Sequence, residues 1–300
     1  MTNTLAGSGT GPSAPSPRGV IAAVRRHPLA AFLAWFFTVG QAIAFVPVVA
    51  GANGAEAFTR PLVAQSFILA STVVGLLLPA VVVTRIVDGP DRARELLRRA
   101  FRLGVPLRWY ALALLGVPAL ATALAVAFLG APAAGVSASA VLSALVFGLL
   151  MQTVVAFVPN NWAEEVAWTG FVQARLQARH GALRAALVAG PLFALQHVSL
   201  VVGAGAAGVV LMAVLVVLAV PFRALTGWTY NRTGSLFVVG VLHAAGNAVA
   251  GGSGYGAGLL PRLYPEDAGV VGAMHLLALA VVGVVVMVAT RGRLGAGARP

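Results

Sequence analysis

Residues 160–171 read NNWAEEVAWTGF and place two neighbouring carboxylates, Glu164 and Glu165, directly after a long apolar run. Acidic residues are scarce elsewhere, because the 300-residue chain has only 8 in total. The remaining ones fall in segments that are predicted to be loops, whereas these two lie in a helical pattern. Ionisable side chains at membrane depth are costly, so both glutamates are candidate functional residues.

The composition predicts an all-α, polytopic transmembrane bundle. Hydrophobic residues make up 59% of the chain, charged residues 9%, and the mean hydropathy is +0.92. These values lie far from those of a soluble domain. The net charge of +12 comes entirely from arginine on the basic side. In a membrane protein such an excess is explained by topology, so the expected partner is the lipid bilayer and no nucleic-acid partner is expected. The absence of cysteine excludes disulfides and thiolate metal sites.

Uncharged stretches long enough to cross a bilayer recur along the chain and predict about eight spans. They lie at about 29–50, 61–84, 109–130, 136–158, 185–202, 204–222, 235–251 and 269–289. The boundary between the fifth and sixth spans is marked only by the glycine-rich piece 203–208, where we expect a turn.

The arginines predict the orientation. With a cytoplasmic N-terminus, all arginines except Arg60 and Arg262 fall in segments predicted to be cytoplasmic, including Arg223 and Arg232 after the sixth span. This bias follows the positive-inside rule and supports an even number of spans. We therefore expect a multi-pass protein of the cell (plasma) membrane with both termini in the cytoplasm.

The same patterns divide the chain into four regions. Residues 1–28 are predicted to be a disordered cytoplasmic tail, and 29–135 to be N-terminal transmembrane helices with a basic cytoplasmic loop. Within that loop, at 85–108, arginines alternate with apolar residues at helical spacing, which predicts an amphipathic helix on the cytoplasmic leaflet. Residues 136–251 form the predicted functional core, and 252–300 hold the last span and a basic tail.

The local structure around the glutamates is predicted from its flanking residues. Pro159 and the two asparagines are expected to interrupt the fourth span, with Asn161 capping a new helix that runs to about Arg179. Glu164 and Glu165 are separated by about 100° on that helix, so only one can face a given cavity. A purely structural interpretation also exists. Asn161 and Glu164 have the spacing of a capping box, and Glu165 could form an ion pair with a cytoplasmic arginine.

Two of the five histidines share the apolar environment of the glutamates. His197 lies one helical turn after Phe193, and His243 lies one turn before Asn247. The others are His27 and His180, which are expected to be solvated, and His275, which is expected to be interfacial or structural. A buried histidine or asparagine can also serve only as a hydrogen bond between helices.

Taken together, these polar groups could hydrolyse a peptide bond without a nucleophilic serine or cysteine. A carboxylate near a histidine can accept a proton from water. Imidazole and asparagine N–H groups can stabilise the oxyanion that then develops.

The motifs resemble those of the CPBP family, which comprises type II CAAX prenyl endopeptidases and the bacteriocin-processing and immunity (ABI) proteins. The resemblance covers 136–250 and rests on Glu164-Glu165 with Trp168, Gly170 and Phe171, on Phe193-x-x-x-His197, and on His243-x-x-x-Asn247. It implies an intramembrane endopeptidase, a hydrolase in which Glu164 activates water with His197. His243 and Asn247 would hold the oxyanion, and Glu165 would shape the site. The expected substrate is a peptide or a lipid-anchored protein.

One position departs from the family pattern, which usually has arginine four residues after the second glutamate. Thr169 stands there and offers one hydroxyl in place of a guanidinium, which puts catalytic activity in doubt. A non-catalytic immunity or scaffold protein therefore stays an alternative, as does a proton-coupled transporter that uses the same buried groups.

The resemblance implies no required cofactor. Zinc is possible, and its ligands would then be Glu164, His197 and His243, a set that leaves one coordination position open for water.

Overall fold

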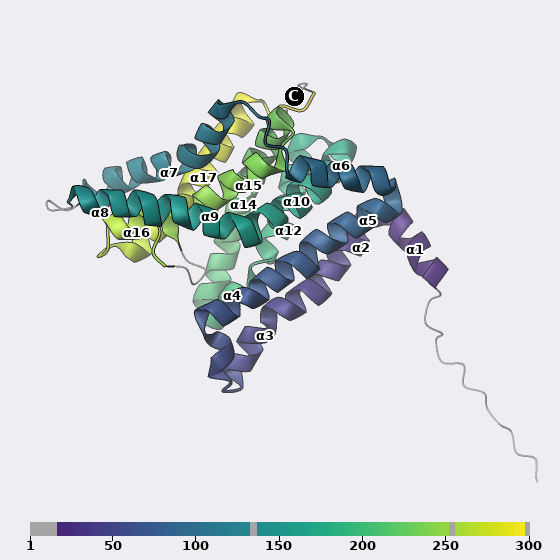
Figure 1. Cartoon of the computed structure of the whole chain (residues 1–300), viewed down its shortest axis with the longest axis horizontal. Coiled ribbons are helices and arrows are strands. Elements are labelled where there is room, and N and C mark those ends of the chain that lie inside the picture. Colours follow the sequence, from purple (N-terminus) through teal and green to yellow (C-terminus); the bar gives the residue numbers. More distant parts are fainter. Residues whose placement is uncertain (1–16, 133–136, 252–255, 298–300) are drawn as a thin grey trace, which may run out of the picture.

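The computed structural model describes residues 17–132, 137–251 and 256–297, and this part of the chain is built from helices (Figure 1). The N-terminal half contains α1 (Pro17–Arg26), α2 (Pro28–Trp35), η1 (Phe36–Gly40), α3 (Gln41–Ala52), η2 (Glu56–Thr59), α4 (Pro61–Ala70), η3 (Ser71–Leu77), α5 (Leu78–Asp88), α6 (Pro90–Ala100) and α7 (Leu107–Leu129). The centre contains α8 (Ala138–Ser143), η4 (Ala144–Met151), α9 (Gln152–Ala156), η5 (Phe157–Asn161), α10 (Trp162–Ala167), η6 (Trp168–Gln173), α11 (Ala174–His180) and α12 (Ala182–Leu195). The remainder contains α13 (Val198–Val201), η7 (Val202–Ala204), α14 (Gly205–Thr233), α15 (Leu236–Ala250), α16 (Leu259–Leu263) and α17 (Ala268–Ala289).

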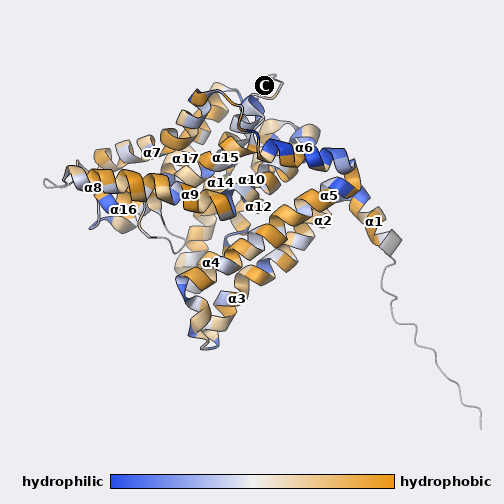
Figure 2. Ribbon diagram, in the orientation of Figure 1, coloured by the Kyte–Doolittle hydropathy of each residue, from blue (hydrophilic) through white to orange (hydrophobic). Residues whose placement is uncertain are grey.

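The predicted all-α polytopic bundle is confirmed, with a refinement in span length. Among the described residues, six helical segments are long and apolar enough to cross a membrane. These are Pro28–Ala52, Pro61–Asp88, Leu107–Leu129, Ala138–Ala156, Val198–Thr233 and Ala268–Ala289. The fifth and seventh expected spans form the shorter apolar helices Ala182–Leu195 and Leu236–Ala250. Figure 2 shows the apolar residues along these segments and the hydrophilic ones gathered on α6.

The predicted N-terminal tail, 1–28, is only partly testable. Residues 1–16 lie outside the described part of the chain. Residues Pro17–Arg26 form α1, so that part of the tail is helical and its assignment as disordered was wrong.

The N-terminal helices form a closely packed hairpin. The continuous segment α2–η1–α3 lies beside α4–η3–α5 (Figure 1). Gly40 and Gly75 allow this approach, because a Cβ on Gly75 would lie 2.6 Å from the Cα of Gly40. Phe32 and Phe36 on this hairpin pack edge-on against Trp168, so the hairpin is attached to the glutamate-bearing helix.

The expected amphipathic helix is present as α6. Its buried residues Ala93, Leu96 and Ala100 repeat at helical spacing and form one face. Leu96 and Ala100 cluster with Val166 of α10 and Leu236 of α15, so α6 covers the ends of both site-bearing helices. Its placement on a membrane leaflet stays a prediction.

The fourth span continues into the glutamate-bearing helix without a break. The backbone is helical from Ala138 to His180, with π-helical turns at η4, η5 and η6. The predicted interruption at the asparagines was therefore wrong. Asn161 has helical backbone angles and its side chain caps nothing, so the capping-box interpretation also fails. The π-turns η5 and η6 flank α10, and such turns alter which residues share a helix face.

The turn expected at 203–208 is present, since α14 begins at Gly205, whose φ of 57° favours glycine. The helix then continues past the predicted end of the sixth span to Thr233. Arg223, which we expected in a cytoplasmic segment, is instead a completely buried residue inside α14. The predicted end of the sixth span at 222 was too early, because the helix does not end until Gly234.

Helix α15 lies at the centre of the functional half and packs against α7, α9, α10 and α17. The hydroxyl of Ser235 caps its N-terminus by accepting from the Val238 N–H at 3.2 Å. A Cβ on Gly240 would lie 3.2 Å from the Cα of Trp162, so glycine permits the close approach of α15 to α10. This approach brings His243 to the glutamates.

Candidate active site

Two polar stripes run along the glutamate-bearing helix. Asn160 and Glu164 are four residues apart and line the same cavity. Asn161, Glu165, Thr169 and Gln173 also repeat every four residues, and they form a chain of polar contacts with α14 and α15. Residues four apart share a helix face, so the helix presents Glu164 to one environment and Glu165 to another, as the angular argument from the sequence predicted.

A cavity of about 440 Å³ brings together four of the five predicted residues. Glu164, His197, His243 and Asn247 all line it, although they come from α10, the turn after α12, and α15. Apolar side chains of α3, α14 and α17 complete its walls. Glu165, the fifth predicted residue, is fully buried and lies behind this wall.

His243 connects the two glutamates. Its Nδ1 lies 3.0 Å from Glu165 Oε1 and 3.8 Å from Glu164 Oε2. Its Nε2 lies 3.4 Å from Asn161 Nδ2. The rings of Phe222 and Phe193 pack against the imidazole at centroid distances of 4.9 and 5.7 Å. The carboxylate of Glu165 selects the tautomer with the proton on Nδ1, and the aromatic rings fix the plane of the imidazole.

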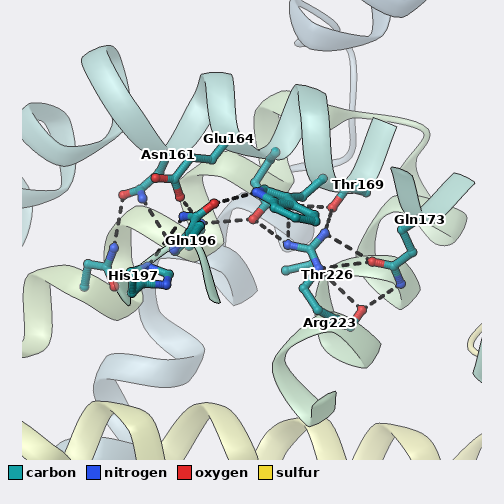
Figure 3. Close-up of polar contacts among 12 residues, drawn as sticks. Asn161, Glu164, Thr169, Gln173, Gln196, His197, Arg223 and Thr226 are labelled. Atoms are coloured by element: carbon teal, nitrogen blue, oxygen red, sulfur yellow. Dashed lines mark hydrogen bonds and ion pairs between the residues drawn. The ribbon is translucent and has the colours of Figure 1, made fainter. Parts of the chain in front are cut away.

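His197 lies where α12 ends, in the turn before α13. Its Nδ1 is 3.3 Å from the carbonyl oxygen of Ala194, and its ring packs on Phe193 at 5.2 Å. Phe193 therefore contacts both histidines, which explains structurally why it precedes His197 by one turn. Figure 3 shows His197 beside Gln196, on the same side of the site as Asn161 and Glu164.

Gln196 and Asn161 extend the polar network and were not predicted as site residues. Gln196 accepts a hydrogen bond from Trp168 Nε1 at 2.5 Å, and its own Nε2 lies 3.5 Å from His197 Nε2. Asn161 accepts from Asn247 Nδ2 at 3.3 Å. The spacing of Asn161 four residues before Glu165 was the available signal, but it was interpreted as a helix cap.

Arg223 is the main residue that the sequence analysis missed. Its Nη1 donates to both carboxylate oxygens of Glu165, at 3.0 and 3.1 Å. Its Nη2 donates to Thr169 Oγ1 at 2.5 Å and to Gln173 Oε1 at 3.1 Å. Figure 3 shows Arg223, Thr169 and Gln173 grouped along the helix, away from Glu164. We call the set Glu165, Thr169, Gln173 and Arg223 the arginine clamp.

The three other histidines differ from one another. His27 and His180 are exposed, as predicted. His275 lines the same cavity as Glu164, and its Nδ1 lies 2.6 Å from the carbonyl oxygen of Gly272. We expected His275 to be interfacial or structural. No feature of the sequence indicated that it lines the cavity.

The predicted zinc ligands are Glu164, His197 and His243. Within the described residues, no three His, Asp or Glu side chains are grouped closely enough to hold a metal ion. Two of the imidazole nitrogens of the proposed set instead face Glu165 and the Ala194 carbonyl. The zinc alternative stays a prediction, and the reaction proposed below uses only side chains of this chain.

Comparison with protein families places these residues in a known group. Residues 148–249 match the family model described as type II CAAX prenyl endopeptidase Rce1-like. This part of the chain resembles the Rce1-like family. The resemblance inferred from the motifs is therefore confirmed, and the Rce1-like segment contains all five predicted site residues. It indicates a membrane protease of the CAAX type in general. A comparison with curated proteins gave no match.

Proposed function

We propose that the chain is an intramembrane endopeptidase in which Glu164 activates a water molecule to cleave a peptide bond. The observation that carries the proposal is the shared cavity, which joins Glu164, His197, His243 and Asn247 while Glu165 is held away from it. The Rce1-like match over the same segment supports the reaction class.

In the proposed reaction, the residues that line the cavity have separate roles. Glu164 accepts a proton from water as the oxygen of that water forms a bond to the scissile carbonyl carbon, and His197 orients the water. The carbonyl oxygen becomes an oxyanion that accepts hydrogen bonds from His243 Nε2–H and Asn247 Nδ2–H. Collapse of the intermediate breaks the C–N bond, and the proton held by Glu164 passes to the leaving nitrogen.

Glu165 makes this role of His243 possible. An imidazole that donates Nδ1–H to a carboxylate can carry a second proton on Nε2, because the carboxylate balances the positive charge. Glu165 and Glu164 lie 3.0 and 3.8 Å from His243 Nδ1, so the charge of a protonated ring would have carboxylate partners. His243 can then donate to the oxyanion from Nε2, once this nitrogen no longer accepts from Asn161 Nδ2.

The cavity also fits an apolar, membrane-associated substrate. Its walls include Leu211, Leu215, Leu218 and Leu276, which belong to helices of membrane-spanning length. A peptide carrying a lipid could place its chain along these leucines and its amide near Glu164. We propose a peptide or lipid-anchored protein as the substrate.

The test is cleavage of a quenched fluorescent peptide by the purified protein in liposomes, with a farnesylated cysteine near the peptide's C-terminus. Glu164→Gln should reduce kcat by about 10²- to 10⁴-fold, since it removes the general base. Glu95→Gln, which changes a carboxylate on α6, serves as the matched control and should retain activity. The same peptide without the prenyl group tests whether the lipid contributes to KM.

Three outcomes would contradict this mechanism. Unchanged turnover in Glu164→Gln would remove Glu164 from the reaction. Binding of the peptide by the wild type without any cleavage would favour the non-catalytic immunity or scaffold alternative. Activity that is lost on chelation and restored by Zn²⁺ would favour the zinc set instead.

A further inference from the structure

The arginine clamp buries the whole guanidinium of Arg223. This residue belongs to α14, which is part of a helical segment of membrane-spanning length. Arg223 has no solvent exposure, and neither does the Glu165 side chain with which it pairs. Burying an ion pair is costly unless the geometry is good and the remaining hydrogen-bonding groups are satisfied. Here the guanidinium contacts both oxygens of Glu165, the hydroxyl of Thr169 and the amide of Gln173.

We propose that Arg223 is a positioning residue that takes over, from a different helix, the role of the arginine that the family pattern places at position 169. The inference rests on the proposed function, because the role concerns the orientation of Glu165 and His243. It also explains why Thr169 does not mark a degenerate site.

Thr169 and Arg223 together fill the space of one arginine. A residue at 169 is four positions after Glu165 and shares its helix face. Thr169 is short enough to leave room for the guanidinium, and its hydroxyl donates to Glu165 Oε2 at 2.5 Å while accepting from Arg223 Nη2. An arginine at 169 would bring a second positive charge to the same buried carboxylate, so the two arrangements exclude each other.

The arginine clamp contacts both the guanidinium and the backbone carbonyl of Arg223. Gln173 accepts from the guanidinium and also donates its Nε2–H to the backbone carbonyl of Arg223 at 2.8 Å. Gly227, one turn after Arg223 on α14, leaves the space that the amide of Gln173 occupies, since a Cβ there would collide with Gln173 Nε2. These contacts fix the guanidinium relative to the glutamate-bearing helix.

Arg223 acts on the reaction only through its neighbours. It does not line the cavity, and its link to the reacting groups runs from Glu165 Oε1 to His243 Nδ1 at 3.0 Å. Loss of Arg223 should therefore lower kcat more than it changes KM.

The experiment exchanges the arginine between the two positions. Arg223→Met and Thr169→Arg should each reduce kcat by about 100-fold, the size expected when a catalytic group is misplaced by roughly 1 Å. The double variant Thr169→Arg/Arg223→Met should recover kcat to within a few-fold of the wild type. Arg175→Met, which removes a part-buried arginine paired with Asp88 on the same bundle, is the matched control and should leave kcat unchanged.

A second measurement separates this inference from the proposed function. The unfolding temperatures of Arg223→Met, Glu165→Gln and their double variant form a cycle that needs no activity. Strong coupling in this cycle supports the clamp even if the wild type cleaves nothing, which would defeat only the proposed function. Wild-type kcat in Arg223→Met, or a well-folded exchange variant that regains no activity, would overturn the inference.

Discussion

Glu164 and Glu165 are neighbours in sequence, yet the structure gives them opposite surroundings. Glu164 lines the cavity, and its Oε2 lies 3.8 Å from His243 Nδ1. Glu165 is completely enclosed and receives hydrogen bonds from Arg223, Thr169 and His243. A carboxylate that is saturated with donors cannot readily accept a proton from water, whereas a carboxylate that faces a cavity can. The difference supports the proposal that Glu164 has the reactive role and Glu165 the supporting role.

The comparison also shows how a membrane protein can keep a charge in its interior. Glu165 accepts hydrogen bonds from the charged guanidinium of Arg223, from the hydroxyl of Thr169 and from the imidazole of His243. Glu164 faces the cavity and is available to a molecule that enters it. A step of one residue along the helix is enough to give the two carboxylates different surroundings, because adjacent residues differ by about 100° in direction.

The largest effect that tests this comparison is on stability. Glu165→Gln should destabilise the fold by about 3–5 kcal/mol, because it leaves the Arg223 guanidinium buried without a counter-charge. Glu164→Gln should cost less than about 1 kcal/mol, because no buried charge loses its only partner. Thermal unfolding of both variants in the same detergent measures the difference. Equal destabilisation by the two substitutions would show that the glutamates are not distinguished as the structure indicates.

Much of this arrangement could be predicted from the sequence. The two glutamates differ in direction because of helical geometry alone. His243, Asn247 and His197 were found because polar side chains in apolar helices are rare. The Rce1-like match confirms the family inferred from these motifs, and the helical bundle is confirmed as well.

Arg223 could not be found in the same way. The positive-inside rule assigns an arginine by its position along the chain, but the partner of Arg223 is 58 residues away on another helix. The stretch after Phe222 contains Gly227 but no turn signal until Gly234, so helical continuation was the available hint. Asn161 was misassigned for a related reason, because its contact with His243 spans 82 residues. Rules based on neighbouring residues predict a helix cap at Asn161. In the structure its side chain contacts residues that are distant in sequence.

A smaller loss of stability is expected when a methyl group is added beside the arginine clamp and all its charges are kept. Gly227→Ala should displace Gln173 and break its hydrogen bond to the Arg223 carbonyl, at a cost of about 1–2 kcal/mol. Gly116→Ala in α7 is the matched control, since a Cβ there meets no atom within 4 Å. Unfolding in detergent compares the two alanine variants. If Gly227→Ala is as stable as Gly116→Ala, Gln173 is not fixed by the clamp.

The smallest effect comes from a glutamate–arginine cluster outside the membrane-spanning segments. Glu95 on α6 receives hydrogen bonds from Arg99 and Arg98, both at 2.7 Å, and these bonds lower the pKa of Glu95. A lowered folded-state pKa means that the cluster stabilises the protein above the unfolded-state pKa and loses this contribution as the pH falls through the folded-state value.

Glu95→Gln should therefore cost no more than about 0.5 kcal/mol at neutral pH, because water and salt screen such pairs. The difference from the wild type should shrink as the pH falls below about 4. Unfolding measured across this range at low and high salt checks both statements. A cost as large as that of Glu165→Gln would mean that burial is not what distinguishes the arginine clamp from the cluster on α6. If the cost of Glu95→Gln vanishes at high salt, the cluster on α6 and the arginine clamp share the same glutamate–arginine chemistry. They then differ in their exposure to water.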